Sequence, residues 1–393
     1  MAIDRSATLA NWMDWPYNRS AFQRVREITP TALIARADEP RPLPQRLQAL
    51  DDLPILTFAG RTTWGQHLDD TQCDAVCVVH DGNIVYERYF NGMTERTPHL
   101  LMSVSKSVCG AALGIAIGNG LLAADDLVCD IAPEFAGTSL DGATVRHVID
   151  MTAGTEFDED YLLYADPDAS NPLLDYERQA GYRPLGNRPA IGTLGHFRTY
   201  GLERPHGAWW SYRSPLTNIA ARLLEVVHDL PYAAIVSRDV WGPLGQEHDA
   251  DIMLDCLGHP VVEGGMSCTV RDLARFGLAY LSDGVADGRQ VIPRAWVDDT
   301  RLGDDEAVRA FHAGLAPDDE TGAWSMYRNA FWVFERGEVF SGLGIFGQFC
   351  WVHRPTRTVI ARFSTFPTAL PLDVSAQCHM AMEAVATALG HSG

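Results

Sequence analysis

The stretch Leu101-Met102-Ser103-Val104-Ser105-Lys106-Ser107 holds the only lysine of a 393-residue chain; the other thirty of its 31 Lys and Arg side chains are arginine. Arginine stays protonated at any working pH, whereas burial can lower the pKa of a lysine to roughly 7–8, where the amine acts as a base. Ser103 and Lys106 are three residues apart, so on a helix their side chains share one face within hydrogen-bonding reach. The stretch therefore predicts a Ser-Lys catalytic pair.

Purely structural roles would also explain this pair: Ser103 as a helix N-cap and Lys106 as a surface charge. The residues that follow argue against a surface position. Val104 to Asn119 is rich in Ala, Gly, Ile and Leu and has hardly any charge, and a helix that is apolar on all sides is buried. Ser103 is therefore expected at the N-terminus of a central helix, where free backbone N–H groups and the helix dipole favour a developing oxyanion.

The composition is that of a globular protein, with 46% hydrophobic and 21% charged residues. No stretch reaches the roughly 18 apolar residues of a membrane span. The N-terminus lacks the basic segment and apolar core of a secretory signal. A net charge of −20 argues against nucleic acid and anionic membrane surfaces as partners. We therefore expect a cytoplasmic protein that binds neither nucleic acid nor membrane.

Eight cysteines are scattered along the chain, and none of them forms a C-x-x-C pair. Cys73 and Cys77 fall on one face of a predicted strand. Free thiols in a reducing cytoplasm are favoured over a disulfide framework or a zinc site. The sequence predicts no metal and no cofactor.

The order of the expected elements predicts an α/β fold with an inserted helical part. Two β-rich runs, 75–79 and 84–90, surround a Gly-containing turn and predict a hairpin. Strands are expected again at 330–334, 346–352 and 358–363, before a final helix at 374–389. The expected division is an N-terminal extension (1–60), an α/β domain (61–130 with 285–393) and a mainly helical insertion (131–284).

The expected helices and loops fill in this outline. Helices are expected at 21–28, 145–151, 215–227, 232–240 and 270–281. Two long irregular stretches, 154–200 and 254–265, are expected to be loops, and long loops in compact domains are often functional.

Three segments in this order resemble the β-lactamase-related serine hydrolases: Ser103 to Lys106 before the buried helix, Thr144 to Gly154, and Tyr212 before a Pro-started helix. This family includes class C β-lactamases, DD-peptidases and carboxylesterases. The resemblance is greatest to its amidase branch, which cleaves 6-aminohexanoate oligomers, and runs from about residue 21 to 367. It implies the transpeptidase-like fold, with an antiparallel sheet flanked by helices and an inserted helical domain.

The resemblance implies a role for each member of the catalytic group. Ser103 would be the nucleophile that forms an acyl-enzyme, and Lys106 would be the base that removes its proton. Tyr212 would carry a proton between these groups and the leaving group; the alternative is a packed aromatic residue. Ser214 stands where many relatives have Asn, and with Pro215 after it would otherwise be only an N-cap.

The segment Gly344-Ile345-Phe346-Gly347 is expected to be a strand beside the nucleophile. By resemblance, the oxyanion hole is formed by the backbone N–H groups of Ser103 and Ile345. Phe346 and Gly347 are expected to contact substrate. β-Lactamases and DD-peptidases carry a cationic motif here that holds a substrate carboxylate, and this chain has none. We therefore expect an uncharged acyl group and weak or no β-lactam turnover.

Two further substrate-binding residues are expected by resemblance alone. Tyr161 matches a tyrosine that closes over substrate in the amidase relatives, and it lies in a predicted loop suited to a lid. Glu177 falls where those enzymes have a carboxylate near the substrate's amino group. In isolation, Glu177 would be interpreted as a solvated loop charge.

Three classes of function follow from these residues. The first is a serine hydrolase with amidase or carboxylesterase activity on a small-molecule amide or ester. The second is a β-lactamase or D-amino-acid peptidase proper, and the third is a non-catalytic binding protein on the same scaffold. The sequence determines neither the natural substrate nor the oligomeric state, and a homodimer is one possible assembly.

Overall fold

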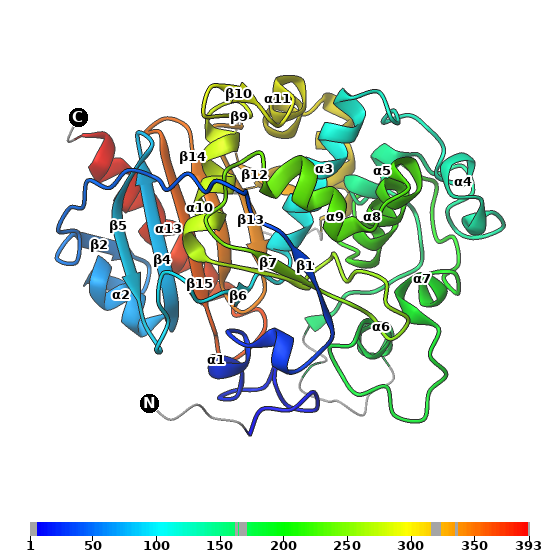
Figure 1. The fold of residues 1–393 in the computed structure, drawn as a ribbon, viewed down its shortest axis with the longest axis horizontal. Coiled ribbons are helices and arrows are strands. Elements are labelled where there is room, and N and C mark those ends of the chain that lie inside the picture. The colour runs from blue at the N-terminus through cyan, green and yellow to red at the C-terminus, as the bar shows by residue number, and fades with distance from the viewer. Residues whose placement is uncertain (1–5, 162–163, 165–170, 316–323, 335–336, 392–393) are drawn as a thin grey trace.

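The computed structural model describes residues 6–161, 164, 171–315, 324–334 and 337–391. Both ends of the chain meet in one antiparallel sheet of seven strands, in the order β11-β12-β13-β14-β15-β4-β5. In Figure 1 the early strands, in blue, lie beside the late strands, in orange. The strands are β4 (Cys73–His80), β5 (Asn83–Tyr89), β11 (Trp324–Arg328), β12 (Phe331–Phe334), β13 (Val339–Gly344), β14 (Gln348–His353) and β15 (Thr358–Ser364).

Strand β4 contributes to two hydrophobic cores because successive side chains of a strand point to opposite faces. Cys77 and Val79 enter the central core, while Val76 and Val78 enter a second one. The first face is covered by α10 (Val270–Leu281) and the second by α2 (Trp64–Asp70) and α13 (Leu372–Gly390). A strand covered on both faces is buried along almost its whole length, as observed for β4.

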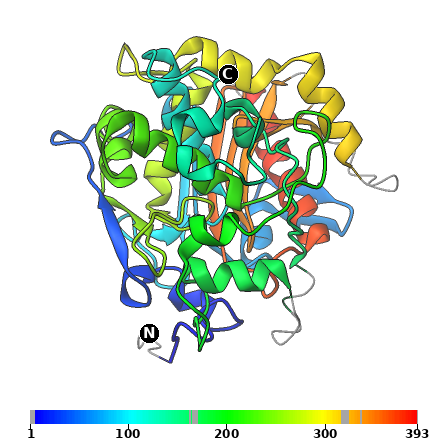
Figure 2. The same cartoon turned by 90° about the vertical axis from the view of Figure 1, so that its right-hand side faces the viewer.

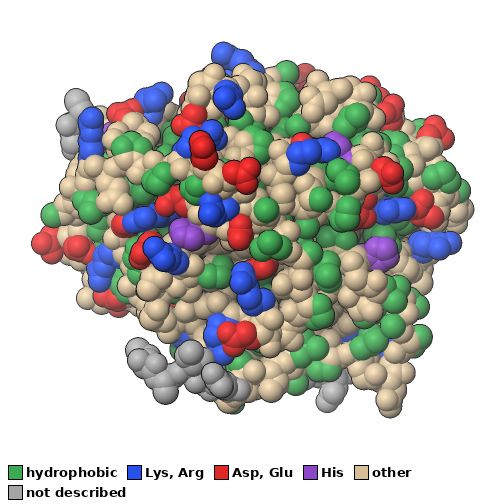
Figure 3. Space-filling view, viewed as in Figure 1, with side chains coloured by type: hydrophobic (Ala, Val, Ile, Leu, Met, Phe, Trp, Pro, Cys, Tyr) green, Lys and Arg blue, Asp and Glu red, His purple; other side chains and the backbone are tan. Residues whose placement is uncertain are grey.

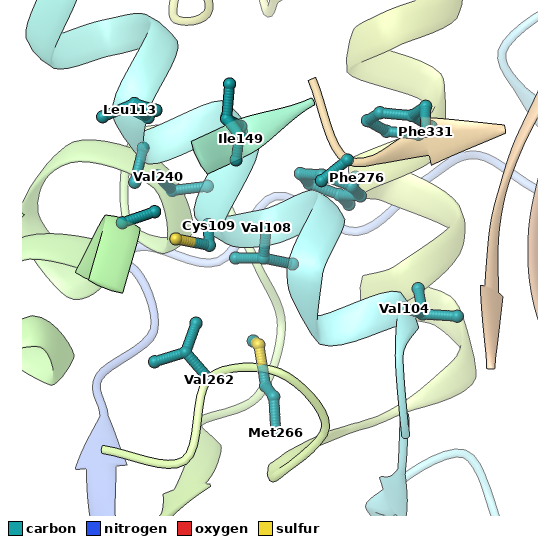
Figure 4. Packing of buried hydrophobic residues seen from close by; sticks show 14 of the residues in the cluster. Val104, Val108, Cys109, Leu113, Ile149, Val240, Val262, Met266, Phe276 and Phe331 are labelled. Atoms are coloured by element: carbon teal, nitrogen blue, oxygen red, sulfur yellow. The ribbon is translucent and has the colours of Figure 1, made fainter. Parts of the chain in front are cut away.

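Helix α3 (Val104–Gly118) is the centre of the mainly helical half of the molecule, which faces the viewer in Figure 2. Figure 4 shows Val104, Val108 and Leu113 pointing from α3 into the surrounding core. Gly110 allows close packing, since a Cβ there would lie 2.4 Å from the Asn329 carbonyl oxygen. The other helices are α1 (Asn18–Ala21), α4 (Val128–Ile131), α5 (Val145–Ile149), α6 (Pro172–Ala180), α7 (Gly192–Phe197), α8 (Pro215–His228), α9 (Tyr232–Val236), α11 (Arg294–Leu302) and α12 (Asp305–Gly314).

A second sheet holds the segments that surround the start of α3. Its strand order is β1-β7-β8-β6, and β6 lies directly before the Ser103 stretch. The Leu101 amide donates to the Met266 carbonyl (2.8 Å), which fixes the chain just before Ser103. These strands are β1 (Thr31–Ile34), β6 (His99–Leu100), β7 (Ala250–Met253) and β8 (Met266–Cys268), and two further pairs are β2 (Pro54–Thr57) with β3 (Gly60–Thr63) and β9 (Val285–Ala286) with β10 (Arg289–Gln290).

Most of the expected elements are confirmed. The hairpin is β4-β5, the buried helix is α3, and α5, α8, α10 and α13 lie within a few residues of their expected positions. The loop at 254–265 is also confirmed, apart from one bridge between Leu254 and Pro260. All eight cysteines are free.

One expected helix and one expected loop are wrong. The expected helix at 21–28 is interrupted because Arg24 has an extended φ of −141°, leaving α1 and a short 3₁₀ turn, Val25–Glu27. The expected loop at 154–200 contains α6 and α7, and residues 162–163 and 165–170 of that stretch lie outside the described ranges. Helix α6 has a recognisable start and end within a stretch whose overall composition is typical of a loop. The Asn171 side chain caps its start, and Gly181, at φ 82°, ends it.

The expected domain boundaries stay a prediction, although the strands of the seven-stranded sheet fall within the two expected α/β segments. Helix α10, expected in the insertion, packs against β4, β14 and β15 of that sheet. Figure 3 shows acidic and basic side chains interspersed on one face of the molecule. No helix within the described ranges is long and apolar enough to cross a membrane.

A buried charge network joins α5 to the turn between β11 and β12. Asp150 accepts hydrogen bonds from Arg328 (2.9 Å) and from the Asn329 amide (2.8 Å), and Arg328 also binds Asp299. We expect Asp150→Ala to lower the free energy of unfolding by about 3 kcal/mol, because removing one partner leaves a buried charge less well compensated. In this variant Arg328 still binds Asp299, so the loss of stability should lie at the lower end of the range usual for breaking a buried ion pair.

Chemical denaturation of Asp150→Ala beside Asp298→Ala measures this effect. Asp298 pairs with Arg301 on the surface of α11 (2.9 Å), and its loss should cost less than about 1 kcal/mol. Equal destabilisation by the two variants would show that the Asp150 network adds nothing beyond a surface pair.

Candidate active site

Ser103 is held at the start of α3 by a constrained backbone. Met102 has a positive φ of 46°, which is uncommon for a residue with a side chain, and Ser103 is the N-cap position of the helix. Ser105 anchors this turn: its hydroxyl donates to the Met102 carbonyl (2.7 Å) and accepts from the Met266 amide (3.1 Å). The Ser103 side chain makes no capping bond, so its hydroxyl remains available for other contacts.

Lys106 lies directly against this hydroxyl. Its Nζ donates to Ser103 Oγ (2.8 Å) and to the Glu263 carbonyl oxygen (2.5 Å), and the residue is only 1% exposed. Burial lowers the pKa of Lys106, while the charges of Glu159 and Glu263 oppose this shift. The surface-charge interpretation is therefore wrong: Lys106 is a buried amine in contact with a serine hydroxyl, an arrangement that can activate a hydroxyl as a nucleophile.

Tyr212 completes this group from the segment before α8. Lys106 Nζ lies 5.1 Å from the centre of its ring, which stacks on Trp332 (5.6 Å) and meets the edge of Tyr327 (5.8 Å). Burial raises the pKa of the Tyr212 phenol, and its contact with the Ser103 hydroxyl opposes that effect. Tyr212 is therefore both a packed aromatic residue and a neighbour of the Ser103 hydroxyl.

Ser214 faces a carboxylate that sequence reasoning did not select. Its amide (2.5 Å) and hydroxyl (2.6 Å) donate to Glu159, and the Tyr161 hydroxyl donates to the same carboxylate. Ser214 occupies the N-cap position of α8 before Pro215, but its side chain does not cap the helix. Glu159 therefore links the loop of Tyr161 to the segment of Tyr212.

Glu177 is buried on α6 and is 5% exposed, so the interpretation as a solvated loop charge is wrong. Arg183 Nε donates to its carboxylate (2.6 Å), and the Tyr164 hydroxyl donates as well. Burial raises the pKa of Glu177, and Arg183 opposes this shift. The negative charge of Glu177 is thus compensated within the protein. Its contact with a substrate amino group stays a prediction.

Residues 345–347 form a turn between β13 and β14, which corrects the expected strand. Phe346 (φ 62°) and Gly347 (φ 90°) have left-handed backbones, which a strand does not allow. Gly344 lets the end of β13 pack against the chain just before Ser103, since a Cβ there would lie 2.5 Å from the Leu101 carbonyl oxygen. The Phe346 ring packs against Phe22 (5.3 Å).

One cavity brings four of the eight expected site residues together: Ser103, Tyr161, Glu177 and Ile345. Lys106, Tyr212, Phe346 and Gly347 are not among its lining residues, and contact of Phe346 and Gly347 with substrate stays a prediction. Within the described ranges, no group of three or more His, Cys, Asp or Glu residues could hold a metal ion. The other lining residues are Met13, Met102, Glu159, Tyr164, Leu173, Tyr176, Tyr182, Ser214, Glu263 and Gly264.

Glu263 is the second carboxylate that sequence reasoning missed. It lies in Val261-Val262-Glu263-Gly264-Gly265, within a loop already expected to be functional. The sequence does contain a signal for this residue, since Glu263 is the one acid in an apolar, Gly-rich run. An acidic side chain in such surroundings is rarely buried unless it has a partner or a functional role.

The fold agrees with comparisons to known proteins. The family profile named Beta-lactamase matches residues 65–376, and the chain belongs to this family. It is 34% identical over 366 residues to the 6-aminohexanoate-dimer hydrolase of Paenarthrobacter ureafaciens, covering 92% of this chain and 88% of that one. These relationships identify it as a hydrolase of the β-lactamase fold.

Solved structures show the same fold. A Bacillus anthracis protein provisionally described as a 6-aminohexanoate-dimer hydrolase superposes with a TM-score of 0.88 at 25% identity, covering 99% of this chain and 98% of that chain. EstCE1, described as a hydrolase with promiscuous acyltransferase activity, gives a TM-score of 0.60 at 15% identity, covering 82% and 98%. The expected antiparallel sheet with flanking helices is thereby confirmed.

Proposed function

We propose that this protein is a serine hydrolase that cleaves amide or ester bonds of small molecules through an acyl-enzyme on Ser103. The observation that carries the proposal is the 2.8 Å contact between the hydroxyl of Ser103 and the buried amine of Lys106. A buried lysine with a lowered pKa is neutral in a larger fraction of molecules, and only the neutral amine can accept a proton.

The proposed reaction begins when Ser103 Oγ attacks the carbonyl carbon and Lys106 takes its proton. The backbone N–H groups of Ser103 and Ile345 receive the oxyanion. The proton then passes to the leaving group, with Tyr212 as the relay. Collapse of the tetrahedral intermediate breaks the bond to the leaving group and leaves the acyl chain on Ser103.

The proposed substrate has an uncharged acyl group near the scissile bond. The turn that carries Ile345 offers no cation to a substrate carboxylate, and the chain's only lysine already contacts Ser103. Arg183 compensates the charge of Glu177. The printed name of the Paenarthrobacter relative supports linear amides of 6-aminohexanoate as a first test. We propose a cytoplasmic location as well.

A panel of p-nitrophenyl esters, 6-aminohexanoate dimer and nitrocefin tests this function. We expect turnover of esters, of the amide dimer, or of both, with little hydrolysis of nitrocefin. Efficient nitrocefin hydrolysis would favour a β-lactamase instead. Absence of turnover on all three, with binding retained, would favour a non-catalytic binding protein.

The lid role of Tyr161 predicts a difference between amides and esters. Tyr161→Phe removes the hydroxyl that donates to Glu159. We expect kcat/KM for an amide to fall on the order of 10²-fold, with a smaller loss for the ester, because an amine leaving group needs protonation. An amide and an ester of the same acyl group provide the matched comparison. Equal losses would remove the reason for this role.

A further inference from the structure

Glu263 presents a buried carboxylate with open acceptor positions to the cavity of Ser103. The residue is 4% exposed, and neither Oε1 nor Oε2 has a hydrogen-bond partner among the described residues. The Tyr176 hydroxyl and the Asn218 amide interact with this carboxylate and favour its ionised form, but neither meets the geometry of a full hydrogen bond to it, and Asn218 Nδ2 also donates to Tyr176 Oη (2.6 Å). A buried carboxylate with unfilled acceptor positions is costly, so these positions are expected to serve a molecule that enters the cavity.

The loop that carries Glu263 is fixed beside the nucleophile. The amides of Val262 (2.8 Å) and Glu263 (3.3 Å) donate to Asn218 Oδ1 on α8. The Glu263 carbonyl accepts from Lys106 Nζ (2.5 Å), which also contacts Ser103 Oγ. The backbone of Glu263 is therefore held against Lys106, and the residue lines the same cavity as Ser103 without being a member of the Ser-Lys-Tyr group.

The charged and titratable groups around Glu263 set its protonation. Burial raises the pKa of this carboxyl, and the charge of Lys106 opposes that shift. Glu159 and Glu263 both favour the charged form of Lys106. The neighbouring phenols are Tyr176, Tyr182, Tyr200 and Tyr212. A carboxylate whose pKa is raised above its usual range is a stronger base toward water than an exposed carboxylate with an ordinary pKa.

We propose that Glu263 is the general base that orients and activates the water molecule that hydrolyses the acyl-enzyme. The inference rests on the acyl-enzyme mechanism proposed above. When the leaving group departs, water takes its place in the cavity and donates a hydrogen bond to an open oxygen of Glu263. A residue with this role touches the reacting water and acts after the first bond has been broken.

The step is balanced in atoms and protons. The water oxygen bonds to the acyl carbonyl carbon while Glu263 takes one of its protons. Collapse of the tetrahedral intermediate breaks the bond between that carbon and Ser103 Oγ. Glu263 passes this proton to Lys106, and the resulting ammonium group donates a proton to Ser103 Oγ as it departs, so free enzyme with neutral Lys106 and a carboxylic acid are released.

Glu263→Gln in the full chain tests the role with p-nitrophenyl acetate, whose leaving group needs no protonation. Stopped-flow absorbance and intact-protein mass spectrometry follow acylation and release separately, at a pH where Lys106 is neutral in both proteins. We expect acylation to change only a few-fold and release to fall about 10²-fold, with the acyl-enzyme accumulating. Hydroxylamine, which needs no general base, should restore most of the release rate.

Matched variants control for charge and folding. Glu338→Gln removes a carboxylate from an exposed position outside the cavity and should leave both steps unchanged. Glu263→Asp keeps a carboxylate at shorter reach and should release acyl groups at an intermediate rate. If Glu263→Gln does not fold, the release rate of Glu263→Asp is compared with that of the wild type instead.

Equal loss of acylation and turnover without an acyl-enzyme would overturn the proposal, since Glu263 would then bind substrate or adjust Lys106. Unchanged release would overturn it as well. Failure of the acyl-enzyme mechanism itself would appear separately, as wild-type turnover in Ser103→Ala.

Discussion

Ser103→Ala is expected to lower kcat by at least about 10⁴-fold and to leave the fold intact. The hydroxyl is needed as the nucleophile, whereas the contacts seen for it among the described residues, with Lys106 and Tyr212, contribute little to the fold. Steady-state kinetics with p-nitrophenyl esters, beside thermal unfolding, measure both effects. The loss should appear in turnover and not in stability.

Ser107→Ala is the matched control within the same helix. Its hydroxyl donates to the Ala330 carbonyl (2.7 Å) and does not line the cavity. We expect this variant to lose about 1 kcal/mol of stability and to keep its turnover. Turnover like that of the wild type in Ser103→Ala would exclude Ser103 as the nucleophile.

Lys106→Arg is expected to lose nearly as much activity as Lys106→Ala, on the order of 10²- to 10⁴-fold. Arginine keeps the positive charge, but a guanidinium cannot act as a base at neutral pH. A purely electrostatic role would let Lys106→Arg retain much of the rate. Comparison of the two variants on one ester therefore separates proton transfer from charge.

The pH profile of kcat/KM gives a second measure of the same role. The base must be neutral, so activity should rise with pH as Lys106 loses its proton. Burial lowers the pKa of Lys106 from its ordinary value of 10.5, so the acidic limb should lie below that value. Because Lys106, Glu263 and Tyr212 interact, the apparent pKa belongs to the group as a whole. High activity in Lys106→Arg with an unchanged profile would exclude Lys106 as the base.

The sequence was most informative where local patterns decide the structure. The continuous apolar run of α3 predicted a buried helix, and a three-residue spacing predicted the contact of Ser103 with Lys106. The β4-β5 hairpin followed from two apolar runs around one turn. These features depend on neighbours in the chain and hardly on the rest of the fold.

Features that depend on distant segments were missed or misplaced. Ser214 and Tyr161 both donate to the Glu159 carboxylate, which only the folded loop brings to α8. Burial of Glu177 needs Arg183, and this pairing is not evident from spacing. The apolar residues around Ile345 predict a strand, whereas the observed turn needs a left-handed backbone at Phe346 that a residue with a bulky side chain rarely adopts.

The central claim, a covalent acyl-enzyme on Ser103, is tested most directly by acid-quenching the wild-type protein during turnover of a p-nitrophenyl ester and mapping its peptides by tandem mass spectrometry. We predict one acyl group per chain, located on Ser103 and absent from Ser103→Ala. An acyl group on another residue, or turnover with no covalent species in the wild type and in the slowly releasing Glu263→Gln variant, would contradict the account.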